Sequence, residues 1–228
     1  MAARAEPAQA PDLLDQVLLV VSGIQVRRTR GGLTRPRGVG VLERHKGHQV
    51  LLDALTRLKT RKPELCWRLI IAGGAGGEEH SSLLRFIAEH GLSAQVHIVL
   101  NRNDVADLLS LSHIFVMPSR WEGLPMAVLE AMVARKAIIA SAIAGIPEAM
   151  VDGRDGLLVP AGDPAALADA LEILLTKPHR RQELADAAAA RAKKEFTAAV
   201  MADRYEALYA SAHAGRERSL LQRVGVAG

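Results

Sequence analysis

The chain has 228 residues, of which 49% are hydrophobic, so it has ample material for a core, and this excludes a chain that is disordered throughout. Aromatic residues make up only 3%, so the core is expected to consist of Leu, Ile, Val, Ala and Met. Lysine and arginine exceed aspartate and glutamate by 29 to 25, and this mild excess does not by itself favour nucleic acid.

Cysteine content and the length of apolar runs bear on the compartment. The single cysteine, Cys66, excludes an intramolecular disulfide framework and fits a reducing cytosol. No apolar run approaches the roughly 20 residues that a membrane-spanning helix needs. The best candidate, residues 18–21, is too short for a signal peptide and is preceded by acidic residues. We therefore expect a cytoplasmic protein.

Five arginines fall between residues 27 and 37, among glycines and a proline. We interpret this basic segment as a solvated linker. The alternative is a peripheral contact with a partner or with the inner face of a membrane. No aromatic residue is interleaved on which bases would stack, so we expect no nucleic acid partner.

Short apolar runs alternate with segments of helical period from Gly38 onward. Several runs are almost continuously apolar, as expected of strands that are buried on both faces. This alternation predicts an α/β fold with a doubly wound parallel sheet. The predicted strands are residues 38–42, 68–72, 96–100, 114–117, 137–141 and 157–159.

Helical periods and capping residues place the helices between these strands. Asp163 followed by Pro164 is a typical helix start, and Gly91 is a typical helix end. The predicted helices are residues 48–59, 82–90, 104–112, 125–134, 165–176, 178–195 and 198–212. The resulting organisation is a tail and basic linker at 1–37, one domain at 38–215 and a C-terminal tail at 216–228.

The segment after the predicted strand 114–117 has the features of an anion site. The strand stops at Pro118, a polar loop covers residues 119–123, and Pro125 stands where a first helical residue would. Ligands of doubly wound sheets bind outside the carboxyl ends of the strands. The unpaired amides and the dipole of a helix that begins there suit a pyrophosphate.

Two carboxylates, Glu122 and Glu130, frame this loop and helix. A carboxylate accepts hydrogen bonds from neighbouring hydroxyl groups, such as those of a sugar or a ribose. The spacing alone leaves open the alternative of an ordinary loop glutamate and an exposed helix glutamate.

The block Pro-Ser-Arg-Trp-Glu-Gly-Leu-Pro at 118–125, followed by Leu-Glu-Ala-Met at 129–132, resembles the E-x₇-E signature of retaining GT-B glycosyltransferases, group 1 (family 4). The likeness covers about residues 38–176. It implies the Rossmann-like, donor-binding half of a GT-B fold. It also implies transfer of a sugar from a nucleoside diphosphate sugar to a glycan or lipid-linked acceptor, with retention of anomeric configuration.

The resemblance also implies roles for individual residues. Glu130 would hold the ribose hydroxyls, Glu122 would contact the donor sugar, and Lys46 would neutralise the diphosphate as charge develops on the leaving oxygen. Further contacts to the donor's sugar, phosphate and base would come from the loops at Gly73, Asp104, Val105, Gly123, Leu124 and Leu129.

No metal or other cofactor is expected, because the resembled class uses fixed cations instead of a metal. The eight histidines are scattered and no H-E-x-x-H spacing occurs. His45 and His48 flank Lys46, and we expect both to be surface residues of the turn.

The sequence departs from the family's pattern at several positions. Val41 stands where the family has an arginine, and Arg44 is the candidate to replace it. His113 stands where an aspartate is usual, and Arg135 and Ala137 stand where a glycine and a proline are usual. The chain before Gly38 is too short for an acceptor-binding domain, so we expect that domain to be a separate domain or chain.

These departures leave an alternative to a complete enzyme, namely a module that binds a nucleotide sugar without catalysis. A sugar epimerase or phosphorylase of the same fold is a further alternative, against which the block at 121–130 argues. A Rossmann dehydrogenase is less well supported, because no G-x-G-x-x-G opens a helix after the first predicted strand.

Overall fold

The computed structural model describes residues 16–21, 42–74, 77–101, 104–123 and 126–223. Within them, six strands form one sheet in the order β3-β2-β1-β4-β5-β6, and neighbouring strands are parallel. The strands are β1 (Gln16–Val21), β2 (Trp67–Gly73), β3 (Val96–Leu100), β4 (Ile114–Met117), β5 (Ala137–Ser141) and β6 (Leu157–Val159). This confirms the predicted doubly wound parallel sheet.

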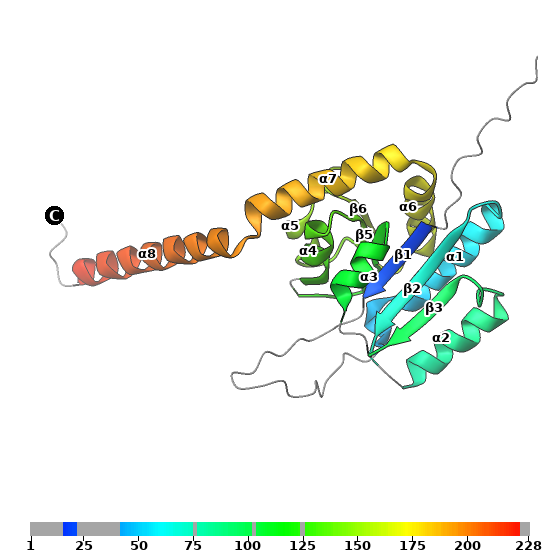
Figure 1. Cartoon of the computed structure of the whole chain (residues 1–228). Helices are drawn as coiled ribbons and strands as arrows, with labels where there is room; N and C mark the ends of the chain where they lie inside the picture. Colours follow the sequence, from blue (N-terminus) through cyan, green and yellow to red (C-terminus); the bar gives the residue numbers. More distant parts are fainter. Residues whose placement is uncertain (1–15, 22–41, 75–76, 102–103, 124–125, 224–228) are drawn as a thin grey trace, which may run out of the picture.

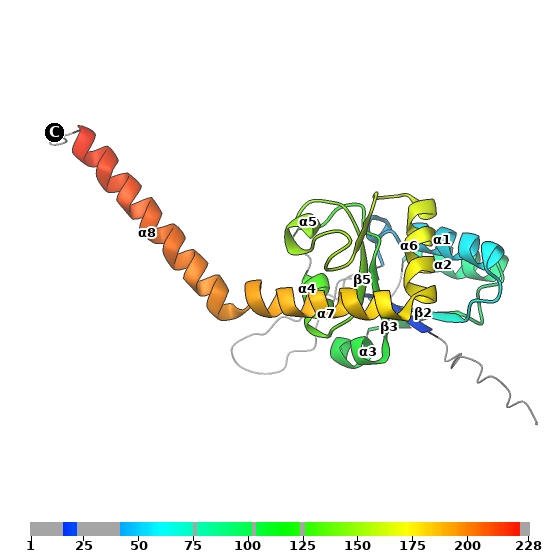
Figure 2. The same cartoon turned by 90° about the horizontal axis from the view of Figure 1, so that it is seen from above.

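Helices cover both faces of the sheet, as Figures 1 and 2 show. The core under one face includes residues of α1 (His48–Arg61), α2 (Glu78–Glu89) and α6 (Pro164–Thr176). The core under the other includes residues of α3 (Val105–Leu111), α4 (Met126–Val133) and α5 (Ile146–Ala149). The long helix α7 (Pro178–Glu195) contributes to both cores.

Side chains alternate between the two cores along β4 and β5. In β4, Ile114 and Val116 belong to the core under α1 and α6, whereas Phe115 and Met117 belong to the core under α4. Successive side chains of a strand point to opposite faces, so a strand that is covered on both faces must be apolar at every position. The continuous apolar runs of the sequence have this origin.

The first strand of the sheet differs from the prediction. Residues 38–41 of the predicted strand 38–42 lie outside the described residues, and Leu42 is not part of a strand. The described chain has β1 at Gln16–Val21, between β2 and β4. A domain boundary at residue 38 therefore leaves a central strand out of the domain. The run 18–21 is apolar like the other strands, but its partners lie far along the chain and local sequence does not show the pairing.

Most other element bounds follow the predicted signals. Asp163 accepts hydrogen bonds from the backbone amides of Ala165 and Ala166 at 2.8 and 3.0 Å, and Pro164 is the first residue of α6. Gly91, with φ of 62°, follows the end of α2. The last helix, α8 (Ala198–Arg223), runs past its predicted end at 212 and through the predicted tail that begins at 216. It projects away from the domain (Figures 1 and 2).

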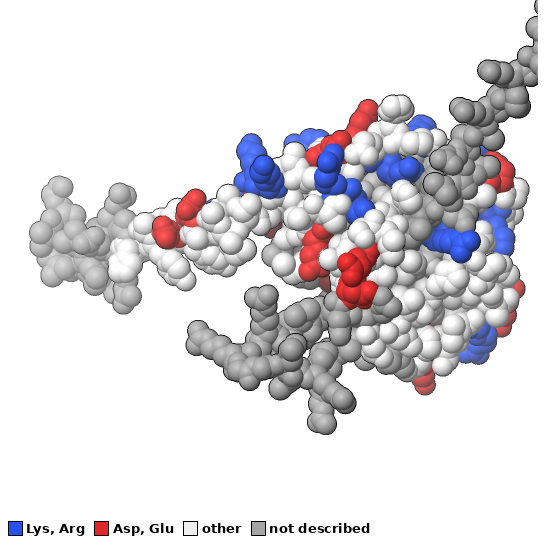
Figure 3. Space-filling view, viewed as in Figure 1, with Lys and Arg blue, Asp and Glu red and all other residues white. Residues whose placement is uncertain are grey.

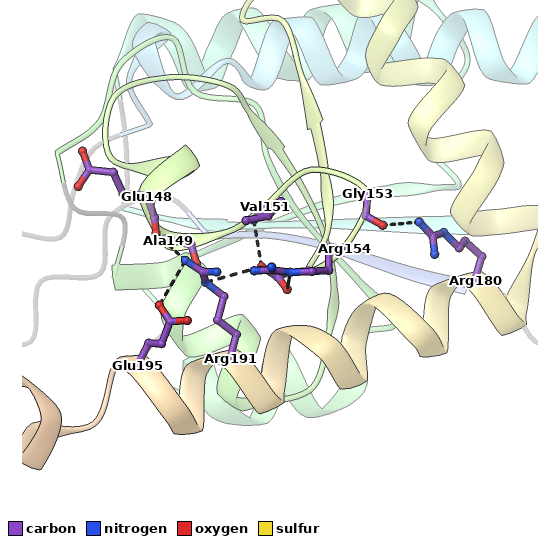
Figure 4. Close-up of polar contacts among 9 residues, drawn as sticks. Glu148, Ala149, Val151, Gly153, Arg154, Arg180, Arg191 and Glu195 are labelled. Carbon is purple, nitrogen blue, oxygen red and sulfur yellow. Dashed lines mark hydrogen bonds and ion pairs between the residues drawn. The ribbon is translucent and has the colours of Figure 1, made fainter.

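Charged groups fasten α7 to the chain between β5 and β6 (Figure 4). Arg191 of α7 donates from Nε to the carbonyl of Ala149, at 2.9 Å, and lies 3.6 Å from Oδ2 of Asp155. Asp155 is buried and accepts hydrogen bonds from the Val151 amide and from Arg154 Nε, each at 3.0 Å. Burial acts to raise the pKa of Asp155, but these hydrogen bonds outweigh it and lower that pKa. The loop that follows β5 is therefore held by a paired, buried charge.

Arg135, which stands where the resembled family has a glycine, adopts a left-handed backbone with φ of 54°. This conformation costs a residue with a Cβ about 1 kcal/mol relative to glycine. Its guanidinium pairs with Asp186 of α7, with Nε 3.1 Å from Oδ1. The ion pair ties the end of α4 to α7, which is a structural reason for the side chain at this position.

We expect Arg135→Gly to be more stable than Arg135→Ala by about 1 kcal/mol. Both variants lose the pair with Asp186, but only glycine adopts the left-handed backbone without strain. Urea unfolding of the two variants measures the difference. Equal unfolding midpoints with equal slopes would contradict this account of residue 135.

Candidate functional site

Two loops meet at the carboxyl edge of the sheet, where the strand order changes direction between β1 and β4. One is the turn η1 (Arg44–Lys46), which leads into α1, and the other is the loop between β4 and α4. The amide of Arg120 donates to the carbonyl of His45 at 2.6 Å, and this hydrogen bond joins the two segments.

Gly47 allows the two segments to come this close. Its φ is 71°, and its amide closes the turn on the carbonyl of Arg44 at 3.2 Å. A Cβ at this position would lie 1.9 Å from the carbonyl oxygen of Pro118. Both the backbone conformation and the contact therefore require glycine.

The convergence brings together Lys46 and Glu122, which lie 76 residues apart in sequence. The Lys46 ammonium lies 2.8 Å from Oε1 of Glu122, and the hydroxyl of Ser119 donates to the same oxygen at 2.8 Å. The Lys46 and Glu122 side chains are only 18% and 13% exposed, so solvent screens the pair less than it screens a surface ion pair. The two residues predicted to act in catalysis thus occupy one site.

An aromatic contact lies beside this ion pair. The rings of His45 and Trp121 stack with centroids 4.0 Å apart and planes 18° from parallel. His45 Nδ1 lies 2.8 Å from a carboxylate oxygen of Glu43. The tryptophan is 64% exposed despite the stack. The sequence predicts a surface position for His45, whose side chain is only 16% exposed, and does not predict the stack, since ring contacts between distant segments leave no local pattern.

Glu130 and its neighbours lie on the helix that follows the loop. Burial raises the pKa of the Glu130 carboxyl, although the residue as a whole is exposed. Among the described residues, no side chain is hydrogen-bonded or ion-paired to this carboxylate. Leu129 is half-buried against the core under α4, and Gly123 is exposed. The predicted contact at Leu124 lies outside the described residues, as does Pro125.

The remaining predicted residues follow the neighbouring strands. Gly73 is the buried last residue of β2, and its carbonyl accepts a hydrogen bond from the amide of Asn101 at 2.8 Å. Asp104 is the N-cap residue of α3 and Val105 is its first residue. Both follow β3, so the three residues share the edge of the sheet that carries the Lys46–Glu122 pair.

Arg44, the candidate to replace the family's arginine, does not join that pair. Its Nε lies 3.4 Å from a carboxylate oxygen of Glu79 in α2, and its side chain is 85% exposed. Lys46 is therefore the cation that the described residues place beside Glu122.

The prediction for His48 is wrong. His48 is the first residue of α1 and is fully buried, because the turn at Gly47 directs it into the core under α1. Burial, together with the charges of Lys46 and His45, lowers its pKa to about 4. It is therefore neutral at physiological pH.

No group of three or more His, Cys, Asp or Glu side chains suited to hold a metal occurs among the residues that the structure describes. Likewise, none of the described helices is long and apolar enough to cross a membrane. On the face drawn in Figure 3, the described basic side chains are interspersed with acidic ones and form no continuous basic surface.

The fold and its switch-point loops define a Rossmann-like α/β domain. The chain belongs to the glycosyl transferases group 1 family, whose family model matches residues 38–194. It is 32% identical over 191 residues to the D-inositol 3-phosphate glycosyltransferase of Arthrobacter sp. (strain FB24), covering 79% of this chain and 45% of that relative. The chain thus spans less than half of the length of this relative.

Solved structures share this fold. Anabaena Alr3699/HepE in complex with UDP superimposes with a TM-score of 0.71 at 20% identity, over 87% of this chain and 50% of that one. The C-terminal domain of a group 1 family glycosyl transferase (LpcC) from Francisella tularensis gives a TM-score of 0.65 at 20% identity, over 80% and 87%. These matches confirm the predicted fold, one Rossmann-like half of a GT-B glycosyltransferase.

His48 makes the stability of the chain depend on pH. Its pKa of about 4 in the folded chain lies below its ordinary value of 6.5, so the unfolded chain takes up the proton first as pH falls. We expect the contribution of neutral His48 to stability to be fully present above pH 6.5 and to be lost progressively toward pH 4, by about 3 kcal/mol in all.

Urea unfolding at a series of pH values measures this loss, with His48→Gln as the control. The variant is expected to lose less stability than the unchanged chain across the interval from pH 6.5 to 4. Parallel stability curves for the two proteins would assign the pH dependence to other groups.

Proposed function

We propose that this chain is the donor-binding half of a group 1 glycosyltransferase that transfers a hexose from a nucleoside diphosphate sugar with retention of configuration. The observation that carries the proposal is the Lys46–Glu122 pair, 2.8 Å apart and shielded at the switch point of the sheet. It puts a cation and a hydroxyl-binding carboxylate side by side, as a phosphorylated sugar requires.

The proposed chemistry follows from these two groups. When the bond between sugar and phosphate breaks, negative charge develops on the leaving oxygen, and a fixed ammonium stabilises that charge. An ammonium has three donors, so Lys46 can hold the diphosphate and keep its contact with Glu122. The second oxygen of Glu122 then remains available for sugar hydroxyls. Lys46 supplies positive charge to the leaving group without a metal ion.

Glu130 is proposed to hold the ribose. Its carboxylate has no partner among the described residues, and it lies on α4, the helix that follows the loop of Glu122. A carboxylate that is partly desolvated and unpaired gains by accepting two hydroxyl donors. Backbone groups at Gly123, Leu124 and Leu129 would complete the phosphate contacts, and Gly73, Asp104 and Val105 would line the side of the base.

The acceptor site is proposed to lie mostly outside this chain, because the chain covers 45% of its relative from Arthrobacter. A separate domain or chain would supply that half and close the cleft over the donor. Acceptors of the glycan or lipid-linked class, or a polyol phosphate like the one named for the relative, are consistent with the proposal. Cytoplasmic location follows as a proposal from the nature of the donor.

Donor binding tests the proposal directly. We expect calorimetric titration with UDP, GDP, ADP and dTDP, and with the sugar derivative of each, to show saturable binding. At least one nucleoside diphosphate should bind together with its sugar derivative. Glu130→Ala should reduce that binding at least tenfold, since it leaves two ribose hydroxyls without their charged acceptor.

Glu89→Ala, at the exposed end of α2, is the matched control and should bind like the unchanged chain. Full retention of affinity in Glu130→Ala would remove Glu130 from the donor site. No binding of any nucleotide would overturn the proposal as a whole.

A non-catalytic donor-binding module is the second candidate function. It is favoured by Arg44, whose pairing with Glu79 leaves Lys46 as the cation at Glu122 within the described chain. Turnover of a labelled donor, by the chain alone and with a candidate acceptor-domain chain, distinguishes the two. Binding without turnover in both settings would favour the module.

A further inference from the structure

The stack of His45 on Trp121 joins the same two segments as the Lys46–Glu122 pair. His45 immediately precedes Lys46 on the turn η1, and Trp121 immediately precedes Glu122 on the loop after β4. The stack and the ion pair are therefore successive contacts across one junction. The hydrogen bond from the Arg120 amide to the His45 carbonyl, at 2.6 Å, is a third contact of the series.

The two segments are a short 3₁₀ turn and an irregular loop at this point. The turn η1 has three residues and no side-chain cap, and residues 119–123 form neither helix nor strand. A lysine side chain has four flexible carbon–carbon links, so the position of its ammonium depends on how well its backbone is held. The contacts across the junction act together with the turn's own backbone hydrogen bonds, from the Lys46 amide to the Glu43 carbonyl at 2.9 Å and from the Gly47 amide to the Arg44 carbonyl at 3.2 Å.

Core packing does not account for Trp121. The residue is 64% exposed and belongs to neither core, so it buries little apolar surface against the fold. What it covers is the His45 ring, whose side chain is only 16% exposed and is fastened on its other side to Glu43. An aromatic residue in this arrangement orients its neighbour more than it stabilises the domain.

We propose that His45 and Trp121 are positioning residues, which set Lys46 against Glu122 so that the diphosphate and the sugar of one donor are held together. The proposal rests on the proposed function. It adds that the affinity for the second phosphate depends on the aromatic stack, whereas the affinity for the nucleoside monophosphate does not.

The experiment compares the affinities of UDP and UMP, measured by calorimetry, for variants of the stack. UDP is chosen because it is bound in the Anabaena structure that this chain resembles. Trp121→Ala and His45→Ala are each expected to weaken UDP about two- to tenfold and to leave UMP unchanged. The double variant is expected to bind UDP about as tightly as the single variant that binds it less well. The second change adds no further loss of affinity, because either change alone removes the whole stack.

Conservative variants distinguish a positioning role of the two residues from a role in folding. Trp121→Phe and His45→Phe keep two stacked rings and should restore UDP binding to within about twofold. Tyr205→Ala, which removes an exposed aromatic residue on α8, is the matched control and should bind both nucleotides normally. The thermal unfolding midpoints of all variants are recorded alongside.

Two results would overturn the inference while sparing the proposed function. One is unchanged UDP affinity in both alanine variants although Lys46→Met has lost it. The other is an equal loss of UDP and UMP affinity, which would make Trp121 a contact of the nucleoside or a folding residue. If the unchanged chain bound none of the nucleotides named above, the proposed function and this inference would fail together.

Discussion

The site depends on one close approach, that of the turn at Gly47 to the carbonyl of Pro118. Gly47 combines a left-handed backbone with the absence of a Cβ, and any side chain would meet the Pro118 oxygen. This approach sets the Arg120–His45 hydrogen bond, the His45–Trp121 stack and the Lys46–Glu122 pair along the same junction. A small steric constraint thus determines whether a cation from one loop and a carboxylate from another share a site.

One departure from the family's pattern is compensated in this chain, and another is not. At residue 135, where the resembled pattern has a glycine, an arginine adopts a left-handed backbone and adds an ion pair to α7. Arg44, the candidate to replace the family's other cation, is engaged with Glu79, so the described chain presents Lys46 as the cation beside Glu122. The first departure leaves the fold unchanged, whereas the second, under the proposed function, bears on how strongly a donor is bound. A conserved fold and a changed donor contact are therefore separate matters in this chain, which spans about half of the length of its relatives.

Sequence patterns located most of the strands that the structure describes. The predicted strands 96–100, 114–117, 137–141 and 157–159 coincide with β3, β4, β5 and β6, because apolar runs bounded by polar residues, proline or glycine leave little freedom in placing their ends. β1 escaped prediction, since its place is decided by pairing with β2 and β4 rather than by its own pattern. His48 was misplaced for a similar reason, as the turn before it decides which way it faces.

By itself, the sequence determined the class of fold and the family, and it indicated Lys46, Glu122 and Glu130 as candidate site residues, because periodicity, capping and a motif are local properties of a chain. Only the tertiary structure decided that Lys46 meets Glu122, that Arg44 turns to Glu79 and that His45 stacks on Trp121. Such contacts join residues far apart in sequence. The distances between these residues are set by the pairing of the strands and by the positions where glycine lets two backbones come close. Neither the pairing nor the close approach can be predicted from any single segment.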